Sequence, residues 1–324
     1  MRRAAVWHAG TMARWASTDI PDQTGRTVLV TGANSGLGLR SAEALARRGA
    51  TVLMACRSAE RAEVARAQVA AVATGRNPVV VALDLADLAS VRTAAAEVVG
   101  SVERLDVLMN NAGVMALPFT RTADGFEVQL GTNHLGHFAL TGLLLPALRR
   151  AAASRVVTTS SAMHRLGGNA WDDPNYERTR YGKWTAYGRS KLANLLFMRE
   201  LARRAGEAGA DVVSVAAHPG YASTHLQGTS ASQSGGWLLS RAAGAVVAVS
   251  NGLVAQSDAA GALPQLYAAT MRDVAPGDYF GPDGPFEMRG GPRKVGMTAN
   301  ARDDEAARRL WTLSEELTGV TYDW

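Results

Sequence analysis

Lysine and cysteine are both scarce in this sequence of 324 residues. Arginine supplies most of the 34 basic side chains, because only three of them are lysines, Lys183, Lys191 and Lys294. The single cysteine, Cys56, excludes an internal disulfide framework and is typical of a protein from a reducing compartment. We therefore expect a cytoplasmic protein.

The sequence also lacks any block of basic residues and any leader of the secretory type. The net charge is +5, but the arginines occur singly or in pairs on the polar faces of predicted helices, so nucleic-acid binding is not expected. No long apolar run follows Met1. The most apolar stretch, 237–255, contains Arg241, Ser250 and Asn251, so we interpret it as a buried or substrate-lining helix rather than a stable membrane span.

Patterns typical of strands and helices alternate along the first two thirds of the chain. Strands are predicted at 26–32, 51–57, 78–85, 105–113, 154–161 and 210–220, and helices at 38–50, 58–75, 87–100, 132–150 and 186–204. The strands are continuously apolar and separated by helices, which predicts parallel pairing through right-handed crossovers, with both faces of the sheet covered. The predicted fold class is α/β, a single doubly wound Rossmann-type domain with a central parallel sheet flanked by helices.

The domain is predicted to span residues 25–324, after an N-terminal extension over 1–24. We expect residues 1–11 to be disordered or to precede the true start site, since the sequence from Met12 onward looks like the usual opening of bacterial proteins of this type. The segment 276–292 is rich in glycine and proline and is interpreted as loops with one short strand. A closing helix is expected over 303–320, with Leu310, Leu313 and Leu317 facing inward.

Three glycines, Gly32, Gly36 and Gly38, lie between the first predicted strand and the first predicted helix, in "VTGANSGLGL". Glycine lets the backbone turn with positive φ and approach a pyrophosphate closely. The N-terminus of the following helix offers unpaired amide groups and a partial positive charge to the same anion. The spacing is T-G-x-x-x-G-x-G, and in this strand–helix context it predicts a dinucleotide site.

The end of the second predicted strand indicates which dinucleotide is bound. An NAD site tends to have a carboxylate there to hold the ribose 2′-hydroxyl, whereas this strand ends in Cys56 and Arg57. An arginine can hold a 2′-phosphate in a bidentate contact, so NADP(H) is preferred over NAD(H). The alternative is that Arg57 is an ordinary surface residue.

One of the rare lysines, Lys191, follows Tyr187 by four residues in "YGRSK". This spacing puts the two side chains on one face of a helix. A nearby ammonium favours the phenolate and is expected to lower the pKa of Tyr187, so that this phenol can exchange protons near neutral pH. The alternative is a half-buried helix tyrosine with no chemical role.

In combination these motifs resemble the short-chain dehydrogenase/reductase family, from Gly25 to about Gly220. The segments "ANSGLG", "ACRS", "TNHLGHFALT" and "SKLANLLF" are most similar to its branch of retinol dehydrogenases and protochlorophyllide reductases, and "LWTLSEELTGV" to bacterial members. The resemblance implies four catalytic residues, Asn133, Ser161, Tyr187 and Lys191. It implies coenzyme contacts, together with Arg57, at Gly32, Asn34, Ser35, Gly36, Leu37, Gly38, Asp84, Leu85, Asn111, Ala112, Gly113, Tyr187, Lys191, Pro219, Gly220 and Thr224.

Within this resemblance Tyr187 would be the general acid and base, and Ser161 would hold the substrate oxygen. Asn133 would hold a water that links Lys191 to solvent. The residues alone leave simpler readings open, with Ser161 as a cap at the end of a strand and Asn133 as a helix N-cap. No metal is expected, because the four histidines considered as ligands lack acidic or cysteine partners at zinc-site spacing; they are His134, His137, His164 and His218.

The preferred hypothesis is an NADP(H)-dependent oxidoreductase that interconverts an alcohol and a carbonyl. Residues 221–256 are apolar and glycine-bearing and would form a lid, which favours a lipophilic small-molecule substrate. Two alternatives remain: a C=C reductase of the protochlorophyllide reductase type, and a non-catalytic NADP(H)-binding module. The sequence leaves a homo-oligomer open.

Overall fold

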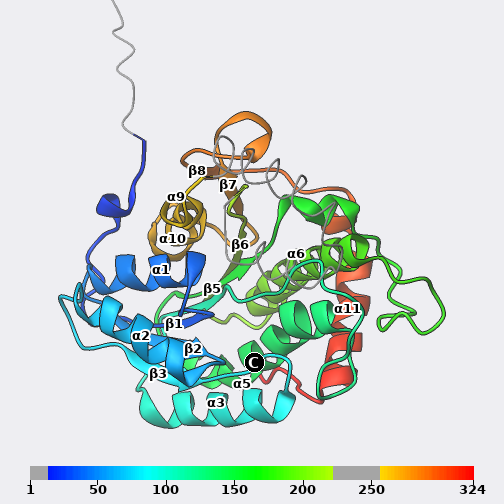
Figure 1. The fold of residues 1–324 in the computed structure, drawn as a ribbon, viewed down its shortest axis with the longest axis horizontal. Coiled ribbons are helices and arrows are strands. Elements are labelled where there is room, and N and C mark those ends of the chain that lie inside the picture. The colour runs from blue at the N-terminus through cyan, green and yellow to red at the C-terminus, as the bar shows by residue number, and fades with distance from the viewer. Residues whose placement is uncertain (1–13, 222–255) are drawn as a thin grey trace, which may run out of the picture.

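The computed structural model describes residues 14–221 and 256–324, and it contains one eight-stranded sheet in the order β3-β2-β1-β4-β5-β6-β7-β8 (Figure 1). Neighbouring strands run parallel, except that β8 is antiparallel to β7. The strands are β1 Thr27–Thr31, β2 Thr51–Cys56, β3 Val79–Ala82, β4 Val107–Asn110, β5 Ser154–Thr159, β6 Val212–Ala217, β7 Tyr279–Pro282 and β8 Pro292–Lys294.

Helices cover both faces of this sheet (Figure 1). The α-helices are α1 Gly36–Ala46, α2 Ala59–Ala70, α3 Leu88–Ser101, α4 Val128–Leu130, α5 Gly136–Arg149, α6 Lys183–Glu207, α9 Asp258–Gly261, α10 Leu263–Thr270 and α11 Asp304–Thr318. A π-helical turn, η2, spans Gly131–Leu135. Short 3-10 turns are η1 Ser17–Asp19, η3 Ala162–Leu166, η4 Pro285–Glu287 and η5 Asn300–Arg302.

The two-residue period of the strands explains the layers. In β1, Val28 and Val30 pack on the side that α1, α2 and α10 cover, whereas Leu29 packs on the side of α3, α5 and α6. Because both faces are apolar, the strands are buried from both sides, as parallel strands require. The predicted doubly wound α/β fold is confirmed.

The helix predicted over 132–150 begins earlier and in a different way. The helical segment starts with α4, where the carboxylate of Glu127 accepts hydrogen bonds from the backbone N–H groups of Gln129 and Leu130. It then continues through the π-helical turn η2 into α5. Asn133 lies inside this turn, so the reading of Asn133 as a helix N-cap is wrong: the cap is Glu127.

The C-terminal third is more regular than the sequence suggested. Helices α9 and α10 were not predicted, although Pro264 in the first turn of α10 is compatible with a helix start. Two short strands, β7 and β8, extend the sheet where one was expected. Glycine and proline were read as signs of loops, but here they begin a helix and edge strands.

The three leucines predicted to face inward from α11 do so. Leu310 is buried, and Leu313 and Leu317 are half-buried and pack against the same core cluster. Trp311 and Ser314, which were not predicted, are also buried, and Trp311 stacks on Phe197 of α6. In the described parts of the chain, no helix is both long and apolar enough to cross a membrane. The stretch 237–255 and residues 1–13 lie outside the described residues.

Candidate active site

The glycine loop between β1 and α1 has the backbone shape that the sequence predicted. Gly32 and Gly36 adopt positive φ angles of 67° and 53°. A Cβ atom on Gly38 would lie 2.3 Å from the carbonyl oxygen of Gly32 and 2.7 Å from Nδ2 of Asn111. Only a glycine at this position allows the loop to fold so tightly against the N-terminus of α1.

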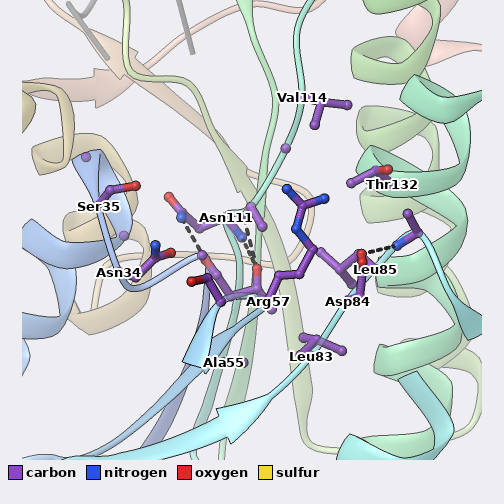
Figure 2. Close-up of a pocket in the computed structure, with 18 of the residues that line it drawn as sticks. Asn34, Ser35, Ala55, Arg57, Leu83, Asp84, Leu85, Asn111, Val114 and Thr132 are labelled. Atoms are coloured by element: carbon purple, nitrogen blue, oxygen red, sulfur yellow. Dashed lines mark hydrogen bonds between the residues drawn. The ribbon is translucent and has the colours of Figure 1, made fainter. Parts of the chain in front are cut away.

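A cavity of about 470 Å³ opens beside this loop, at the carboxyl ends of β1, β2, β3 and β4 (Figure 2). It lies where the strand order turns back from β1 to β4, the usual place for a ligand in an open parallel sheet. Twelve predicted coenzyme residues line it: Gly32, Asn34, Ser35, Gly36, Leu37, Gly38, Arg57, Asp84, Leu85, Asn111, Ala112 and Gly113.

The wall at the end of β2 is basic. Arg57 points into the cavity (Figure 2), and Arg61, four residues further along in α2, also lines it. The sequence analysis missed Arg61, although its spacing from Arg57 was a usable signal. Cys56 is buried, and burial raises the pKa of its thiol to about 11, so it stays neutral at physiological pH.

Asn111 and Thr31 join the ends of β4 and β1 under the cavity. The Asn111 side chain donates from Nδ2 to the carbonyl oxygen of Thr31 over 2.8 Å (Figure 2). The Thr31 hydroxyl oxygen in turn accepts hydrogen bonds from the backbone N–H groups of Asn111 and Ala112, both at 2.9 Å. The wall formed by residues 111–113 is therefore fixed to the strand that carries the glycine loop.

His137 extends this network to the π-helical turn. Its Nδ1 lies 3.0 Å from the carbonyl oxygen of Asn133, and its Nε2 lies 2.9 Å from the Thr31 hydroxyl. Burial lowers the pKa of His137 to about 4, so the ring is neutral. Because a carbonyl can only accept, Nδ1 carries the hydrogen and Nε2 accepts from Thr31. Across residues 14–221 and 256–324, no group of three or more His, Cys, Asp or Glu side chains is placed to hold a metal ion.

Tyr187 and Lys191 are buried beside the cavity, with the half-buried Ser161 next to them. Tyr187 and Lys191 are only 6% and 4% exposed, and the Lys191 Nζ atom lies 5.8 Å from the centre of the Tyr187 ring. Lys191 donates from Nζ to the carbonyl oxygen of Thr159 at 3.2 Å. The Ser161 side chain lies close enough to the Tyr187 hydroxyl to lower its pKa. Ser161 also caps η3 by accepting from the N–H of Met163, so the capping role considered for it holds as well.

The expected lowering of the Tyr187 pKa is wrong for this structure. Burial raises the pKa of Tyr187 to about 12, and the Ser161 side chain opposes this only in part. Burial also lowers the pKa of Lys191 to about 8. The spacing of the two residues indicated that they are neighbours, but it could not show that both would be withdrawn from water.

Asn133 supports the site through its carboxamide. Its Oδ1 accepts from the N–H of Val114 at 2.7 Å, and its Nδ2 donates to the Val114 carbonyl and to the Ser190 hydroxyl, both at 2.9 Å. Both N–H donors of the side chain are thus used within the protein, which leaves neither of them for the expected water. A Cβ on Gly113 would lie 2.9 Å from Asn133 Oδ1 and 3.4 Å from Lys191 Nζ. Gly113 is therefore where the cavity lies next to Asn133 and Lys191.

Two of the remaining predicted residues, Pro219 and Gly220, are described by the structure and do not line the cavity. Both follow β6, and Gly220 has a positive φ of 69°. Thr224 lies outside the described residues, as does nearly all of the predicted lid at 221–256. Thr132 and Val114, which the sequence analysis did not select, do line the cavity (Figure 2).

A Lys191→Met variant is expected to be more stable than the parent protein at pH 7. The difference between the ordinary lysine pKa of 10.5 and the value of about 8 corresponds to about 3 kcal/mol of lost stability at neutral pH, at roughly 1.4 kcal/mol per pKa unit. This cost is present below pH 8 and disappears as the pH rises to 10.5, because the folded state releases its proton first. The free energy of unfolding, measured in urea from pH 7 to pH 10, should therefore rise for the parent and not for the variant.

The exposed Lys183 provides the control for this measurement. A Lys183→Met variant should follow the parent protein across the whole pH range. If Lys191→Met were the less stable protein at pH 7, burial would not be the main influence on this ammonium.

Similarity to known proteins assigns this chain to a family. The family model for short chain dehydrogenases matches residues 26–235. The chain therefore belongs to the short-chain dehydrogenase/reductase family of oxidoreductases, whose members bind nicotinamide coenzymes, and within it to the retinol dehydrogenase-like branch.

Three similar proteins illustrate the relationship. Retinol dehydrogenase 13 from Homo sapiens is 41% identical over 298 residues, which cover 91% of this chain and 85% of that protein. A crystal structure of a protein from Mycobacterium paratuberculosis is 42% identical, with a TM-score of 0.78 and coverage of 96% of this chain and 100% of that chain. The Pseudomonas aeruginosa RhlG/NADP active-site complex is 25% identical, with a TM-score of 0.63 and coverage of 82% and 98%.

Proposed function

We propose that this protein is an NADP(H)-dependent oxidoreductase that interconverts an alcohol and a carbonyl on a lipophilic substrate, with Tyr187 as general acid and base. The observation that carries the proposal is the buried Tyr187 beside the cavity, with the half-buried Ser161 side chain acting on its hydroxyl and the Lys191 ammonium next to its ring. A reduction requires a proton donor that is held in place and shielded from water, and this group supplies one.

The proton chemistry follows from the pKa values of these groups. With a pKa near 12, Tyr187 is a neutral phenol at pH 7 and can donate its proton to a carbonyl oxygen. In the direction of oxidation it would have to accept the proton of the alcohol, and a positive charge nearby favours the phenolate that does so. Lys191, with a pKa near 8, is mostly cationic at pH 7 and supplies such a charge. The Ser161 hydroxyl would hydrogen-bond to the same substrate oxygen and stabilise its developing charge.

The cavity fits a dinucleotide on its own geometry. The glycine loop leaves no room for a Cβ at Gly38, and the N-terminus of α1 lies beside it, as a pyrophosphate site needs. We assign the coenzyme to the twelve lining residues, with Lys191 toward its nicotinamide end. A bound nicotinamide coenzyme supplies or accepts a hydride.

Two features support NADP(H) over NAD(H). The end of β2 presents Arg57 and Arg61 to the cavity and has no carboxylate at the position of Cys56. The RhlG structure, which shares the fold and a quarter of the sequence, is a complex with NADP. Guanidinium groups can hold a 2′-phosphate, whereas they offer no particular partner to a 2′-hydroxyl.

A lipophilic substrate is supported by the relatives. The name of retinol dehydrogenase 13 denotes action on a lipophilic alcohol, and that protein aligns with 91% of this chain. We extend this substrate class to the present protein. A single buried cysteine accords with the proposed cytoplasmic location.

A coenzyme and substrate screen tests the proposal. Oxidation of NADPH and of NADH is measured with lipophilic aldehydes, ketones and enones, for the parent, Arg57→Gln and Arg76→Gln. We expect carbonyl reduction with NADPH, and in Arg57→Gln an increase of KM for NADPH of about tenfold or more, since charged hydrogen bonds contribute about 1.5–3 kcal/mol. The KM for NADH should change little.

The exposed Arg76 lies outside the cavity lining and should leave both coenzymes unaffected. Turnover of enones with no turnover of carbonyls would indicate a C=C reductase instead. Binding of NADPH without turnover of any substrate would indicate a coenzyme-binding module. Equal KM values for the two coenzymes in the parent would contradict the NADP(H) assignment.

A further inference from the structure

Gln265 is a buried polar side chain in α10, outside the cavity and outside the part of the chain that the family model matches. Its Nε2 donates to the hydroxyl of Ser41 at 2.7 Å and to Oδ1 of Asn111 at 3.2 Å. Its Oε1 accepts from the hydroxyl of Thr159 at 3.1 Å. One side chain, 3% exposed, therefore links α1, the end of β4 and the end of β5. Figure 1 shows α10 on the same side of the sheet as α1.

The link to Asn111 fixes the orientation of an amide that supports the glycine loop. Asn111 uses Nδ2 toward the Thr31 carbonyl and Oδ1 toward Gln265. The same Nδ2 is the atom that a Cβ on Gly38 would meet at 2.7 Å. If the donor at Gln265 is lost, Asn111 Oδ1 is left without this partner, and only the Thr31 carbonyl still fixes the orientation of the amide.

The link to Thr159 reaches the catalytic group. The Thr159 carbonyl accepts from Lys191 Nζ at 3.2 Å and from Asn194 Nδ2 at 2.9 Å, while its hydroxyl donates to Gln265. Thr159 is 6% exposed, so water does not readily replace either partner. Gln265 thus fixes the residue that anchors Lys191.

We propose that Gln265 is a positioning residue that aligns the glycine loop, through Asn111 and Ser41, with the Lys191 anchor at Thr159. The inference rests on the proposed coenzyme function of the cavity. It assigns to α10 a role in coenzyme binding, although Gln265 itself does not line the cavity. When every polar group of a buried network has a hydrogen-bond partner, the segments that the network joins are held in one arrangement.

The test is direct titration with NADPH, which needs no knowledge of the substrate. Gln265→Met keeps the length of the side chain but removes its four hydrogen bonds, which join it to Ser41, Asn111, Thr159 and the carbonyl oxygen of Leu37. We expect its Kd for NADPH to rise about tenfold, because buried partners are left unsatisfied. Ser41→Ala removes one link and should raise the Kd by a smaller factor. The Kd of the double variant Gln265→Met/Ser41→Ala should equal that of Gln265→Met, because Ser41 acts through its hydrogen bond with Gln265.

The control is Thr270→Val on the same helix. Thr270 is buried, and its hydroxyl bonds only within α10, to the carbonyl of Leu266. Its loss should lower the thermal midpoint and leave the Kd for NADPH within about twofold of the parent value. A Kd for Gln265→Met that is also within this range, with normal binding by the parent protein, overturns the positioning role alone.

Failure of the proposed function has a different signature, because the parent protein would then not bind NADPH at all, and the inference would fall with it. If Gln265→Met does not fold, Ser41→Ala decides the matter. A Kd for Ser41→Ala equal to that of the parent contradicts the proposal, and a raised Kd with an unchanged thermal midpoint supports it.

Discussion

A Tyr187→Phe variant is expected to lose about 10²- to 10⁴-fold in kcat, the range that a positioned general acid or base contributes. Phenylalanine keeps the buried ring but removes the hydroxyl that lies close to the Ser161 side chain. The Ser161 hydroxyl is a much weaker acid than a phenol, and its oxygen caps η3, so it should not replace Tyr187 as the proton donor. The Kd for NADPH should be almost unchanged, so the loss should fall on kcat.

Steady-state kinetics on a good substrate from the screen would measure this loss. Tyr267→Phe is the matched control, because it removes a hydroxyl that bonds Asp273 away from the cavity. A Tyr187→Phe enzyme with the kcat of the parent would refute the assigned acid and base role. It would leave only the coenzyme site as a functional assignment.

A Gly38→Ala variant is expected to lose NADPH binding by about 100-fold or more, because overpacking by one methyl group against backbone costs several kcal/mol. The added Cβ would lie 2.3 Å from the Gly32 carbonyl oxygen, which cannot move without changing the loop. Relief would require the glycine loop and α1 to separate, and that would change the site where the pyrophosphate is expected. Fluorescence titration with NADPH, together with the thermal midpoint, would separate lost binding from lost folding.

Gly100 is the matched control for this substitution. It lies near the end of α3, and a Cβ there would meet no atom within 4 Å. Gly100→Ala should bind NADPH as the parent does and be equally or slightly more stable, because alanine favours the helix. Binding by Gly38→Ala that equals that of Gly100→Ala would mean that the loop does not form the coenzyme site.

Much of the fold and of the coenzyme cavity could be predicted from the sequence because the signals were local. Apolar strands between helices required a parallel sheet with two covered faces, and glycines at 32, 36 and 38 required a tight loop. Residues 111–113 were predicted as the end of a strand, and their place in the coenzyme site was implied by the family resemblance; in the structure they directly follow β4. Each of these predictions depended on a few neighbouring residues.

The parts that could not be predicted depend on segments that are distant in sequence. The pKa of Tyr187 is set by burial, and burial depends on how α6 packs against the rest of the chain. The carboxamide of Asn133 in the π-helical turn contacts Val114 and Ser190, which are distant from it in sequence. Gln265 has no motif around it, and its importance emerges only when Ser41, Asn111 and Thr159 meet in space.

The sparing use of lysine has a practical consequence. Lys183 and Lys294 lie on the surface, whereas Lys191 is buried. Arginine guanidinium groups keep their charge throughout the usable alkaline range, so raising the pH discharges the interior ammonium while the exterior remains cationic. Isotopic labelling of lysine alone would thus place one spectroscopic reporter inside the protein, with two solvent-facing signals as internal references.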